Sequence, residues 1–391
     1  MLKYDYLIIG GGMTADAASH GIRDRDKTGT IGIITADNHA PYNRPPLSKA
    51  LWKGDSPDTI WRPVNETGAT LHLGRHARAL DTDAKQVMDD VGESYNYGKL
   101  LLATGGTPRK LPGSPDDVIY YRTFDDYQRT RKLADGGARF IVVGGGFIGA
   151  EVAAGIRMQG RDVTMIIPEA GICARVFPRD LAAFVAQYYR DKGVTVSTED
   201  GVTNIAERGA GFRVQTKKSG DVDADAVVAG LGITPDVDLA KTAGIATENG
   251  IIVDEQLRTN KADVYAAGDV ANFMNAALGA RTRVEHEDNA NTMGAMAGRN
   301  MAGASERYDH LPFFYSDLFE LGYEAVGDVD ARHQTVADWK TEFREGVVYY
   351  LDAGRVRGVL LWNVWGKVDD ARALIAERGP IDPARLKGRI A

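Results

Sequence analysis

The sequence holds a single cysteine, Cys173, in 391 residues. A lone cysteine excludes a disulfide within the chain and is typical of a reducing compartment such as the cytoplasm. No apolar run approaches the roughly 20 residues of a membrane-spanning helix. The first predicted strand begins by Tyr4, which leaves no room for a signal or transit peptide. A formal net charge of −7 argues against a general nucleic-acid binder. We therefore expect a cytoplasmic protein without a membrane span or a nucleic-acid partner.

Glycine, in contrast, gathers in two turns that each follow an apolar strand. Residues 10–15 read GGGMTA and residues 144–149 read GGGFIG. Glycines in such a turn let the backbone approach a pyrophosphate, and the following helix offers N–H groups and a positive dipole end to it. Ala15 replaces the third glycine of the first turn, which the pattern tolerates. Two turns of this kind predict two dinucleotide sites, one for a flavin and one for a nicotinamide.

An acidic residue is expected after the second strand of each unit, where it binds a ribose. Glu169 stands twenty residues after Gly149 and favours NADH over NADPH, because its charge repels a 2′-phosphate. Arg175 leaves NADPH open, because it could pair with that phosphate. In the first unit Ala36 occupies the usual position of the acid and Asp37 follows it.

The pattern of apolar residues predicts an α/β fold with two Rossmann-like domains and a C-terminal α+β domain. We expect a flavin domain over residues 1–118 and 245–310, an inserted nicotinamide domain over 119–244, and the last domain over 311–391. Strands are expected at 4–9, 30–35, 70–73, 99–103, 140–143, 162–167, 194–197, 226–231, 263–267, 347–351 and 358–362. Helices are expected at 13–23, 147–159, 180–192, 289–301 and 368–378, with another from Ser48 to Lys53. Asp269 stands at a strand end, where it could also cap a helix that follows.

Several further motifs resemble the flavoprotein family of apoptosis-inducing factor and the ferredoxin reductases of bacterial oxygenase systems. They cover nearly the whole chain in order and comprise residues 41–49 (PYNRPPLSK), 103–109 (ATGGTPR), 144–151, 267–269 (AGD), 284–286 (VEH), 315–318 (YSDL) and 322–325 (GYEA).

The resemblance implies the residues that contact FAD. They are Gly10, Gly11, Gly12, Asp37, Arg44, Lys49, Ala77, Thr104, Gly105, Arg122, Gly268, Asp269, Glu285, His286 and Tyr315. It also implies that Lys49 lies beside the flavin N5 and pairs with Glu151. Lys49, Glu151, His286 and Tyr315 are the catalytic residues that it suggests.

The resemblance likewise implies the contacts of NADH. They are Gly144, Gly146, Phe147, Ile148, Gly149, Glu169, Arg175, Gly232, Glu285 and Glu324, with the two glutamates on the nicotinamide carboxamide. Tyr315 stands where relatives usually have tryptophan, so stacking is retained over a smaller area. No metal site is expected.

Two departures from relatives narrow the function. Only about 331–345 separates the strands between which animal apoptosis-inducing factors carry a long regulatory insertion, so a death-signalling role is not supported. The segment 48–53 carries no cysteine, which argues against the thiol chemistry of disulfide reductases and peroxidases.

The resemblance thus implies a flavoprotein that passes hydride from NADH to FAD and electrons to a small iron–sulfur protein, a ferredoxin or rubredoxin. Such partners are usually acidic, and Arg23, Arg25 and Lys27, or Arg75 and Arg78, could form a basic patch for one. A slow NADH-sensing redox protein that forms a homodimer on reduction is the alternative. A reductase of quinones or oxygen is the third.

Overall fold

A computed structural model describes residues 1–377 and 379–390. The chain forms two compact units, and each is described by itself. The first unit comprises residues 1–43, 58–107 and 234–312, and the second comprises residues 44–57, 108–233 and 313–391. The predicted division into 1–118, 119–244, 245–310 and 311–391 stays a prediction.

The first unit is built on a sheet with a parallel core. Apolar β1 (Leu2–Ile9) lies between β2 (Ile31–Ile34) and β6 (Ser94–Leu102), and β3 (Thr70–His72) and β18 (Val264–Ala266) extend the sheet in the same direction. Antiparallel β4 (Ala77–Asp81) and β5 (Gln86–Asp89), which the sequence did not predict, complete it. The strands of the parallel core are buried on both faces, which explains their continuous apolar runs.

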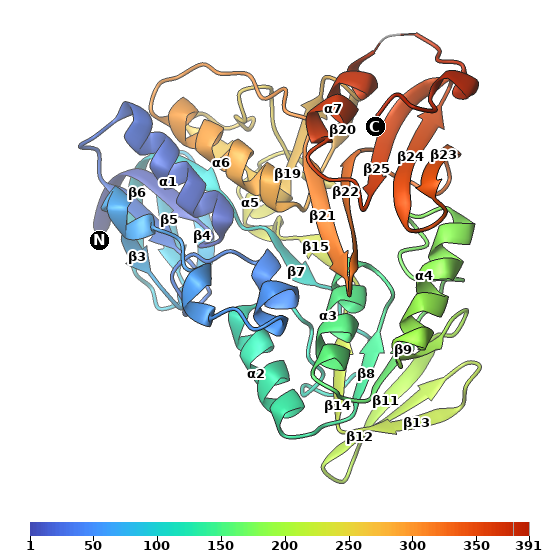
Figure 1. Ribbon diagram of the computed structural model, residues 1–391. Coiled ribbons are helices and arrows are strands. Elements are labelled where there is room, and N and C mark those ends of the chain that lie inside the picture. Colours follow the sequence, from blue (N-terminus) through green and yellow to red (C-terminus); the bar gives the residue numbers. More distant parts are fainter. Residues whose placement is uncertain (378, 391) are drawn as a thin grey trace. The chain divides into compact units, whose positions relative to one another are not determined.

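Two helices of this unit pack unusually closely. Figure 1 shows α1 (Met13–Arg25) beside α6 (Glu287–Met301). A Cβ atom on Gly21 would lie 2.0 Å from the carbonyl oxygen of Ala295, and one on Gly298 would lie 2.0 Å from that of Ala18. Glycine at these positions therefore lets the two backbones touch, which holds α1 closely against α6.

The rest of the first unit is a small four-stranded sheet and short helices. The elements are α5 (Asp238–Thr242), β16 (Thr247–Glu248), β17 (Gly250–Ile252), β19 (Ala271–Asn275), β20 (Ala280–Thr282) and the 3₁₀ turns η4 (Val64–Thr67) and η5 (Gly268–Val270). Asp269 therefore lies within a 3₁₀ turn and does not cap a following α-helix. One 3₁₀ turn runs directly into β19, whose side chains are needed in the core. The chain passes between the units within η3 (Pro57–Ile60), β7 (Gly106–Pro108) and β15 (Ile233–Pro235).

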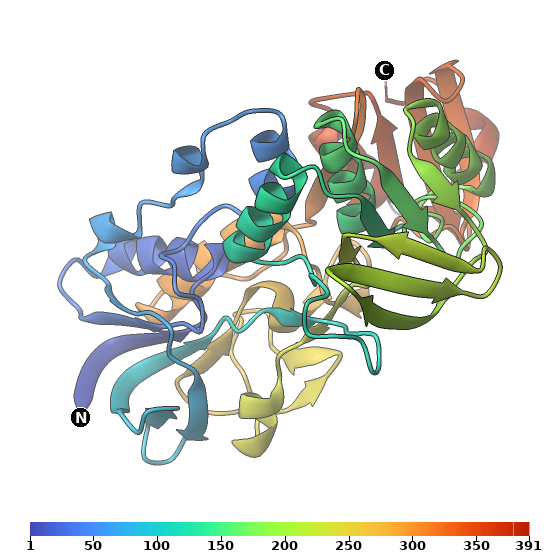
Figure 2. The same ribbon diagram turned by 90° about the horizontal axis from the view of Figure 1, so that it is seen from below.

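The second unit contains a second parallel sheet. Its strand order is β10 (Thr195–Ser197), β9 (Val163–Ile166), β8 (Phe140–Val143) and β14 (Ala226–Ala229). The helices of this part are α2 (Phe124–Asp135), α3 (Phe147–Met158) and α4 (Arg179–Asp191). Figure 2 shows the separate antiparallel sheet of β11 (Val202–Arg208), β12 (Gly211–Thr216) and β13 (Asp221–Ala224), which the sequence did not predict.

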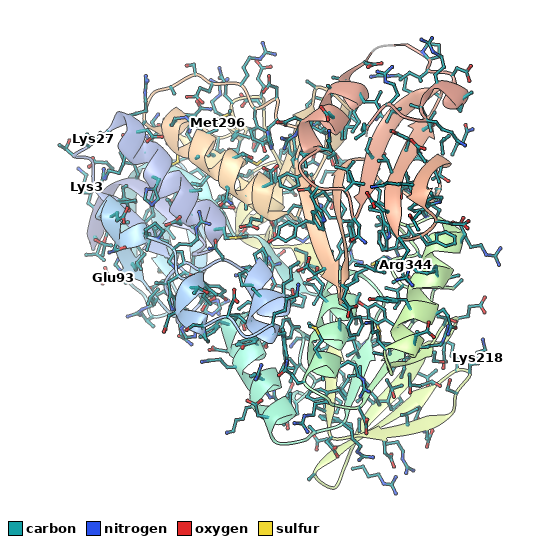
Figure 3. The ribbon with its side chains drawn as sticks, viewed as in Figure 1. Lys3, Lys27, Glu93, Lys218, Met296 and Arg344 are labelled. Atoms are coloured by element: carbon teal, nitrogen blue, oxygen red, sulfur yellow. The ribbon has the colours of Figure 1, made fainter. Side chains whose placement is uncertain are left out.

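A five-stranded antiparallel sheet closes the second unit. Its order is β21 (Phe313–Leu318), β22 (Leu321–Gly327), β25 (Arg355–Trp362), β24 (Glu345–Asp352) and β23 (Gln334–Thr341). α7 (Val368–Ala376) and η6 (Pro383–Arg385) follow. Arg344, labelled in Figure 3, lies beside α4, with its guanidinium 5.1 Å from the ring centre of Phe184 and 5.4 Å from that of Tyr188.

The predicted fold class, two Rossmann-like domains with a C-terminal domain built on an antiparallel sheet, is confirmed. One prediction near the site is wrong. Residues 48–53 form no continuous helix, because η1 (Pro45–Ser48) and η2 (Ala50–Trp52) are broken at Lys49. The last helix ends at Ala376, and Arg378, its predicted end, lies outside the described residues, as does Ala391. Within the described ranges no helix is long and apolar enough to cross a membrane.

Candidate functional site: two glycine turns and a buried ion pair

The first glycine turn joins β1 to α1. Gly10 has φ +112°, and a Cβ atom there would lie 2.1 Å from the carbonyl oxygen of Ala103. Around Gly12, nothing lies within 4 Å of the place where a Cβ would stand. Gly12 is the N-cap of α1, and no side chain caps the helix. Uncapped N–H groups behind an open glycine fit a bound pyrophosphate.

Gly11 and Gly268 line the same end of the first unit. A Cβ on Gly11 would lie 2.4 Å from Thr35 Oγ1, and one on Gly268, which has φ +78°, would lie 2.3 Å from Thr14 Oγ1. Thr14 belongs to the first turn of α1, so the AGD segment approaches the glycine turn closely. The structure therefore brings Gly10, Gly11, Gly12 and Gly268 together within one unit.

Arg283 organises the next residues and was missed by the sequence analysis. Its guanidinium contacts Glu285 Oε1 at 2.6 Å and donates hydrogen bonds to the backbone oxygen of Asp269 at 3.0 Å and to Asn249 Oδ1 at 3.1 Å. The Arg283 side chain is only 9% exposed. Arg283 thus fixes two of the expected FAD residues against each other. Its place directly before the VEH motif was the available signal.

The other expected FAD residues of the first unit have defined places. His286 is the N-cap residue of α6, Thr104 Oγ1 donates to the backbone oxygen of Asp236 at 2.7 Å, and Gly105 has φ +67°. Ala77 begins β4 opposite Asp89.

Asp37 is held by its own loop. Its Oδ2 accepts from the Tyr42 hydroxyl at 2.9 Å and its Oδ1 accepts from the His39 backbone N–H at 3.1 Å. A role of Asp37 at a ribose stays a prediction.

The second glycine turn, between β8 and α3, repeats the first. Gly144 has φ +100° and Gly146 has nothing within 4 Å of its Cβ position. Gly146 is the N-cap of α3, again without a side-chain cap. A Cβ on Gly149 would lie 2.1 Å from the Gly144 carbonyl oxygen, so the third glycine is required here for close packing. This turn also fits a pyrophosphate.

Apolar side chains border this second turn. Phe147 lies 5.1 Å, centroid to centroid, from Phe314 of β21, and Ile148 is 39% exposed. Gly232, with φ +80°, accepts a hydrogen bond from the Arg109 backbone N–H through its carbonyl oxygen. The second turn is thus bordered by an aromatic pair and a partly exposed isoleucine.

Glu169 and Arg175, both expected at the adenosine ribose, form an ion pair. Arg175 Nη2 lies 2.7 Å from Glu169 Oε1, and the side chains are 81% and 27% exposed. The exposed arginine is a counter-ion that a ligand can displace at low energetic cost.

A buried carboxylate, Glu151 of α3, forms the centre of the second unit's polar network. Its side chain is 2% exposed, and Lys49 Nζ lies 2.8 Å from its Oε1. The predicted pair is therefore present. The hydroxyls of Ser48 and Ser316 also donate to it, each at 2.5 Å, and were missed by the sequence analysis although both lie in quoted motifs. Three donors from three chain segments hold one charge, as a buried ion requires.

The backbone explains how Lys49 reaches this carboxylate. Pro45 and Pro46 favour a tight first turn because their φ angles are fixed. Lys49 then leaves helical geometry, with φ −127° and ψ −93°, between η1 and η2. Its Nζ lies 5.2 Å from the Tyr315 ring centre, so a cation lies beside an aromatic ring as well as a carboxylate. Arg44, just before the prolines, donates to the Arg122 backbone oxygen at 2.8 Å.

Glu324 lies directly opposite Tyr315 in the register of β21 and β22. Burial raises the pKa of the Glu324 carboxyl, and a hydrogen bond from the Gly366 N–H partly offsets this rise.

Cys173 is fully buried, and burial raises the pKa of its thiol, so it is not a reactive thiolate. The described residues contain no group of three His, Cys, Asp or Glu side chains that could hold a metal.

Comparison with known proteins decides the family. The family model described as pyridine nucleotide-disulphide oxidoreductase matches residues 4–294. The chain belongs to this family. The family's members use FAD and NAD(P)H. A model for the mitochondrion-associated C-terminal region of apoptosis-inducing factor also matches residues 297–341 and 337–377.

Individual relatives within the family belong to both expected branches. The mitochondrial apoptosis-inducing factor 1 of Dictyostelium discoideum is 33% identical over 97% of this chain and 80% of its own. The ferredoxin–NAD(+) reductase component of the anthranilate 1,2-dioxygenase system of Burkholderia cepacia is 34% identical over 97% and 96%. Putidaredoxin reductase, crystallised in a covalent complex with putidaredoxin, is 27% identical, with a TM-score of 0.91 over 99% and 96%.

Proposed function

We propose that this oxidoreductase binds FAD in the first unit and NADH in the second, and passes electrons to a small iron–sulfur protein. The observation that carries the proposal is the pair of open, uncapped glycine turns together with the buried Lys49–Glu151 pair. One dinucleotide site alone would fit many enzymes. Two sites in one chain suit transfer of a hydride between two cofactors.

The side chains have separate tasks in this proposal. Gly10, Gly11 and Gly12 hold the FAD pyrophosphate, while Arg283 holds Glu285 and the Asp269 backbone in place. Gly144, Gly146 and Gly149 hold the NADH pyrophosphate. Bound flavin accepts a hydride and can release electrons one at a time, which makes a one-electron partner chemically suitable. In the first unit, the N-terminus of α6 supplies positive charge, which would favour a reduced, anionic flavin. In the second unit, Lys49 supplies positive charge beside Tyr315.

The class of electron acceptor is inferred from the proteins that this chain resembles. Proteins named as ferredoxin reductases cover nearly the full chain, and one was crystallised with its iron–sulfur partner. The two basic patches considered from the sequence receive little support. Arg23 donates to the backbone oxygens of Thr67 and Asp26, and Arg75 lies 3.8 Å from Asp89. The cytoplasmic location stays a prediction.

The similarity to apoptosis-inducing factor supports a second candidate, a slow NADH-sensing redox protein that dimerises on reduction. A quinone or oxygen reductase is the third. Steady-state NADH oxidation with a ferredoxin, a quinone and oxygen as parallel acceptors separates them. The proposal expects the ferredoxin to be reduced fastest. Faster quinone or oxygen reduction supports the third candidate, and slow turnover with all three, together with a doubled mass by ultracentrifugation after NADH addition, supports the second.

A further inference from the structure

Trp52 is a buried tryptophan in the short segment that carries Lys49. It ends η2, three residues after Lys49, and is only 2% exposed. Its ring meets the ring of Tyr127 on α2 edge to face, with 5.7 Å between the ring centres. The Arg131 guanidinium, also on α2, lies 5.7 Å from the centre of the indole. Trp52 therefore anchors the segment in the interior of the second unit.

Trp52 and Tyr121 together hold one backbone carbonyl group. The Trp52 Nε1–H donates to the Leu47 carbonyl oxygen at 2.9 Å, and the buried Tyr121 hydroxyl donates to the same oxygen. A continuous α-helix would give this oxygen to the N–H of Leu51, four residues further on. Because a carbonyl oxygen has two lone pairs, two side-chain donors satisfy it without a helix. These bonds thus favour the interruption of the helix at Lys49.

One side of α3 receives this segment at three successive positions. Glu151, Gly155 and Gln159 are spaced four residues apart, so they follow one another along the same side of the helix. Lys49 Nζ lies 2.8 Å from Glu151 Oε1, and Gln159 Nε2 donates to the Trp52 backbone oxygen at 2.7 Å. Between them, a Cβ on Gly155 would lie 2.7 Å from Trp52 Cγ. The three contacts fix where the segment lies along α3.

Gly155 is informative because glycine lowers the stability of a helix interior. Alanine would be favoured at this buried position if nothing approached the backbone. The Trp52 ring is what approaches it, with three of its side-chain atoms within 3.1 Å of the Cβ position. The glycine therefore provides the space in which the indole lies, one helical turn after Glu151.

We propose that Trp52 is the positioning residue of Lys49, which sets where the ammonium group meets the Glu151 carboxylate. Trp52 acts only through Lys49, by holding the Leu47 carbonyl and packing on Gly155. The part of this inference that concerns reduction by NADH rests on the proposed function. The part that concerns the place of the ammonium group does not, because it can be measured on the protein by itself.

Reductive methylation with formaldehyde and cyanoborohydride, followed by mass spectrometry, measures the accessibility of Lys49, whose side chain is 10% exposed. We expect Trp52→Phe, which loses the N–H donor, and Gly155→Ala, which displaces the ring, to speed methylation of Lys49 about fivefold. Lys218, which is 60% exposed, is the internal reference and should react at the wild-type rate.

The matched control is Trp362→Phe. Trp362 is also fully buried, and its Nε1–H also donates to a backbone carbonyl, that of Phe343 at 3.0 Å. It lies on β25, and its replacement removes the same kind of bond without touching the segment that carries Lys49. We expect the methylation rate of Lys49 in this control to equal that of the wild type.

A double-mutant cycle tests whether Trp52 acts through Lys49. In anaerobic stopped-flow measurements on the FAD-loaded protein, Trp52→Phe should lower the limiting rate of flavin reduction by NADH about fivefold. The NADH concentration that gives half of this rate should change by less than about twofold, since nucleotide contacts are untouched. In a Lys49→Ala background the same substitution should change neither value, because the group that it positions is absent.

The other outcomes decide against the inference. Methylation of Lys49 at the wild-type rate in both Trp52→Phe and Gly155→Ala overturns it. A rate of reduction that Trp52→Phe lowers equally with and without Lys49 also overturns it, because the tryptophan would then have a structural role alone. If Trp52→Phe does not fold, Gly155→Ala takes its place in the cycle. Wild-type flavin that NADH does not reduce would refute the proposed function, and the methylation rates would still decide the inference.

Discussion

The two glycine turns have similar backbone conformations but differ at the third position of the glycine pattern. Gly149 cannot carry a side chain, because a Cβ would lie 2.1 Å from the Gly144 carbonyl oxygen. Ala15 at the corresponding place in α1 is fully buried and its methyl group is accommodated. The first turn obtains its close helix contact elsewhere, where Gly21, Gly294 and Gly298 join α1 to α6. The pattern of three glycines is thus a packing requirement that each domain satisfies in its own way.

The acids that follow the second strands differ as well. Asp37 gives both oxygens to its own loop, whereas Glu169 pairs with an arginine that is 81% exposed. A loop fixed by internal bonds suits a cofactor that stays bound. A displaceable counter-ion suits a ligand that exchanges at every turnover. This contrast is what we expect of a resident FAD and an exchanging NADH.

The largest effect on NAD⁺ binding is expected for Gly149→Ala. The added methyl group must push α3 away from the turn, so we expect a loss of at least about 1–3 kcal/mol in the free energy of unfolding, and loss of NAD⁺ binding. FAD content should be retained, because the first turn is untouched. Ala15→Gly is the matched change in the other turn and should cost only about 0.5–1 kcal/mol. Thermal unfolding and calorimetric titration measure both, and equal effects would break the comparison.

Lys49→Ala should have the next largest effect. It leaves the Glu151 carboxylate, 2% exposed, without its cation, which costs about 3–5 kcal/mol in stability if the carboxylate stays charged. Its effect on NAD⁺ binding should be smaller than that of Gly149→Ala, although its cost in stability is larger. Reduction by NADH should slow in stopped-flow measurements. The control is Lys53→Ala, whose pair with Asp317 is 42% and 30% exposed and contributes about 0–1 kcal/mol. A Lys49→Ala protein with the wild-type reduction rate would contradict the role of Lys49.

Glu169→Arg sharpens the contrast between the two acids. Removal of the charge that opposes a 2′-phosphate should narrow or invert the preference for NADH over NADPH, by about tenfold or more. Stopped-flow reduction with both nucleotides measures the ratio. Arg175→Ala is the companion variant. If it shifts the ratio and Glu169→Arg does not, Arg175 selects the cofactor instead.

The smallest effect concerns one acid in each unit. Hydrogen bonds from the N–H groups of Thr28 and Gly29 and from the Tyr6 hydroxyl lower the pKa of Asp26 to about 2. Burial opposes ionisation of Asp200, but hydrogen bonds from Ser219, Ser197 and Lys218 still lower its pKa to about 2. Because both pKa values are depressed, their stabilisation is present above the ordinary value of 3.8 and is lost as pH falls toward 2.

Asparagine variants test this pH dependence. Asp200→Asn, at a fully buried position, should lose about 1 kcal/mol at neutral pH, since a neutral amide is a weaker acceptor. The difference from wild type should disappear near pH 2. Asp26→Asn should behave alike in the first unit. Thermal unfolding across pH measures both, and a difference that grows as the solution is acidified would show that the sign is wrong.

Sequence patterns predicted the features that depend on local backbone geometry and on residues near one another in the chain. Both glycine turns, their strands and their helices could be predicted, because apolar runs and glycine spacing reflect local geometry. The strands β4, β5 and β11 to β13 were missed because they are half exposed and carry mixed side chains. The break at Lys49 was missed because it is a tertiary effect, in which a buried carboxylate more than 100 residues away holds the ammonium group.

Side chains that act by holding other side chains also could not be predicted from the sequence. Ser48, Ser316 and Arg283 have no sequence pattern of their own, and only the fold shows which carboxylates they hold. In both units, glycine patterns predict where a dinucleotide would bind, whereas the charges around the two turns distinguish them.

An anaerobic titration of the gel-filtered protein with NADH, followed by visible absorbance, tests the central claim most directly. Gel filtration removes an exchanging nucleotide and retains a resident flavin. We predict a yellow protein that releases FAD on denaturation and is bleached fully by about one equivalent of NADH, since one hydride carries the two electrons that FAD accepts. A protein that carries no FAD and cannot be reconstituted with it, or whose bound FAD is not bleached by NADH, would contradict the account.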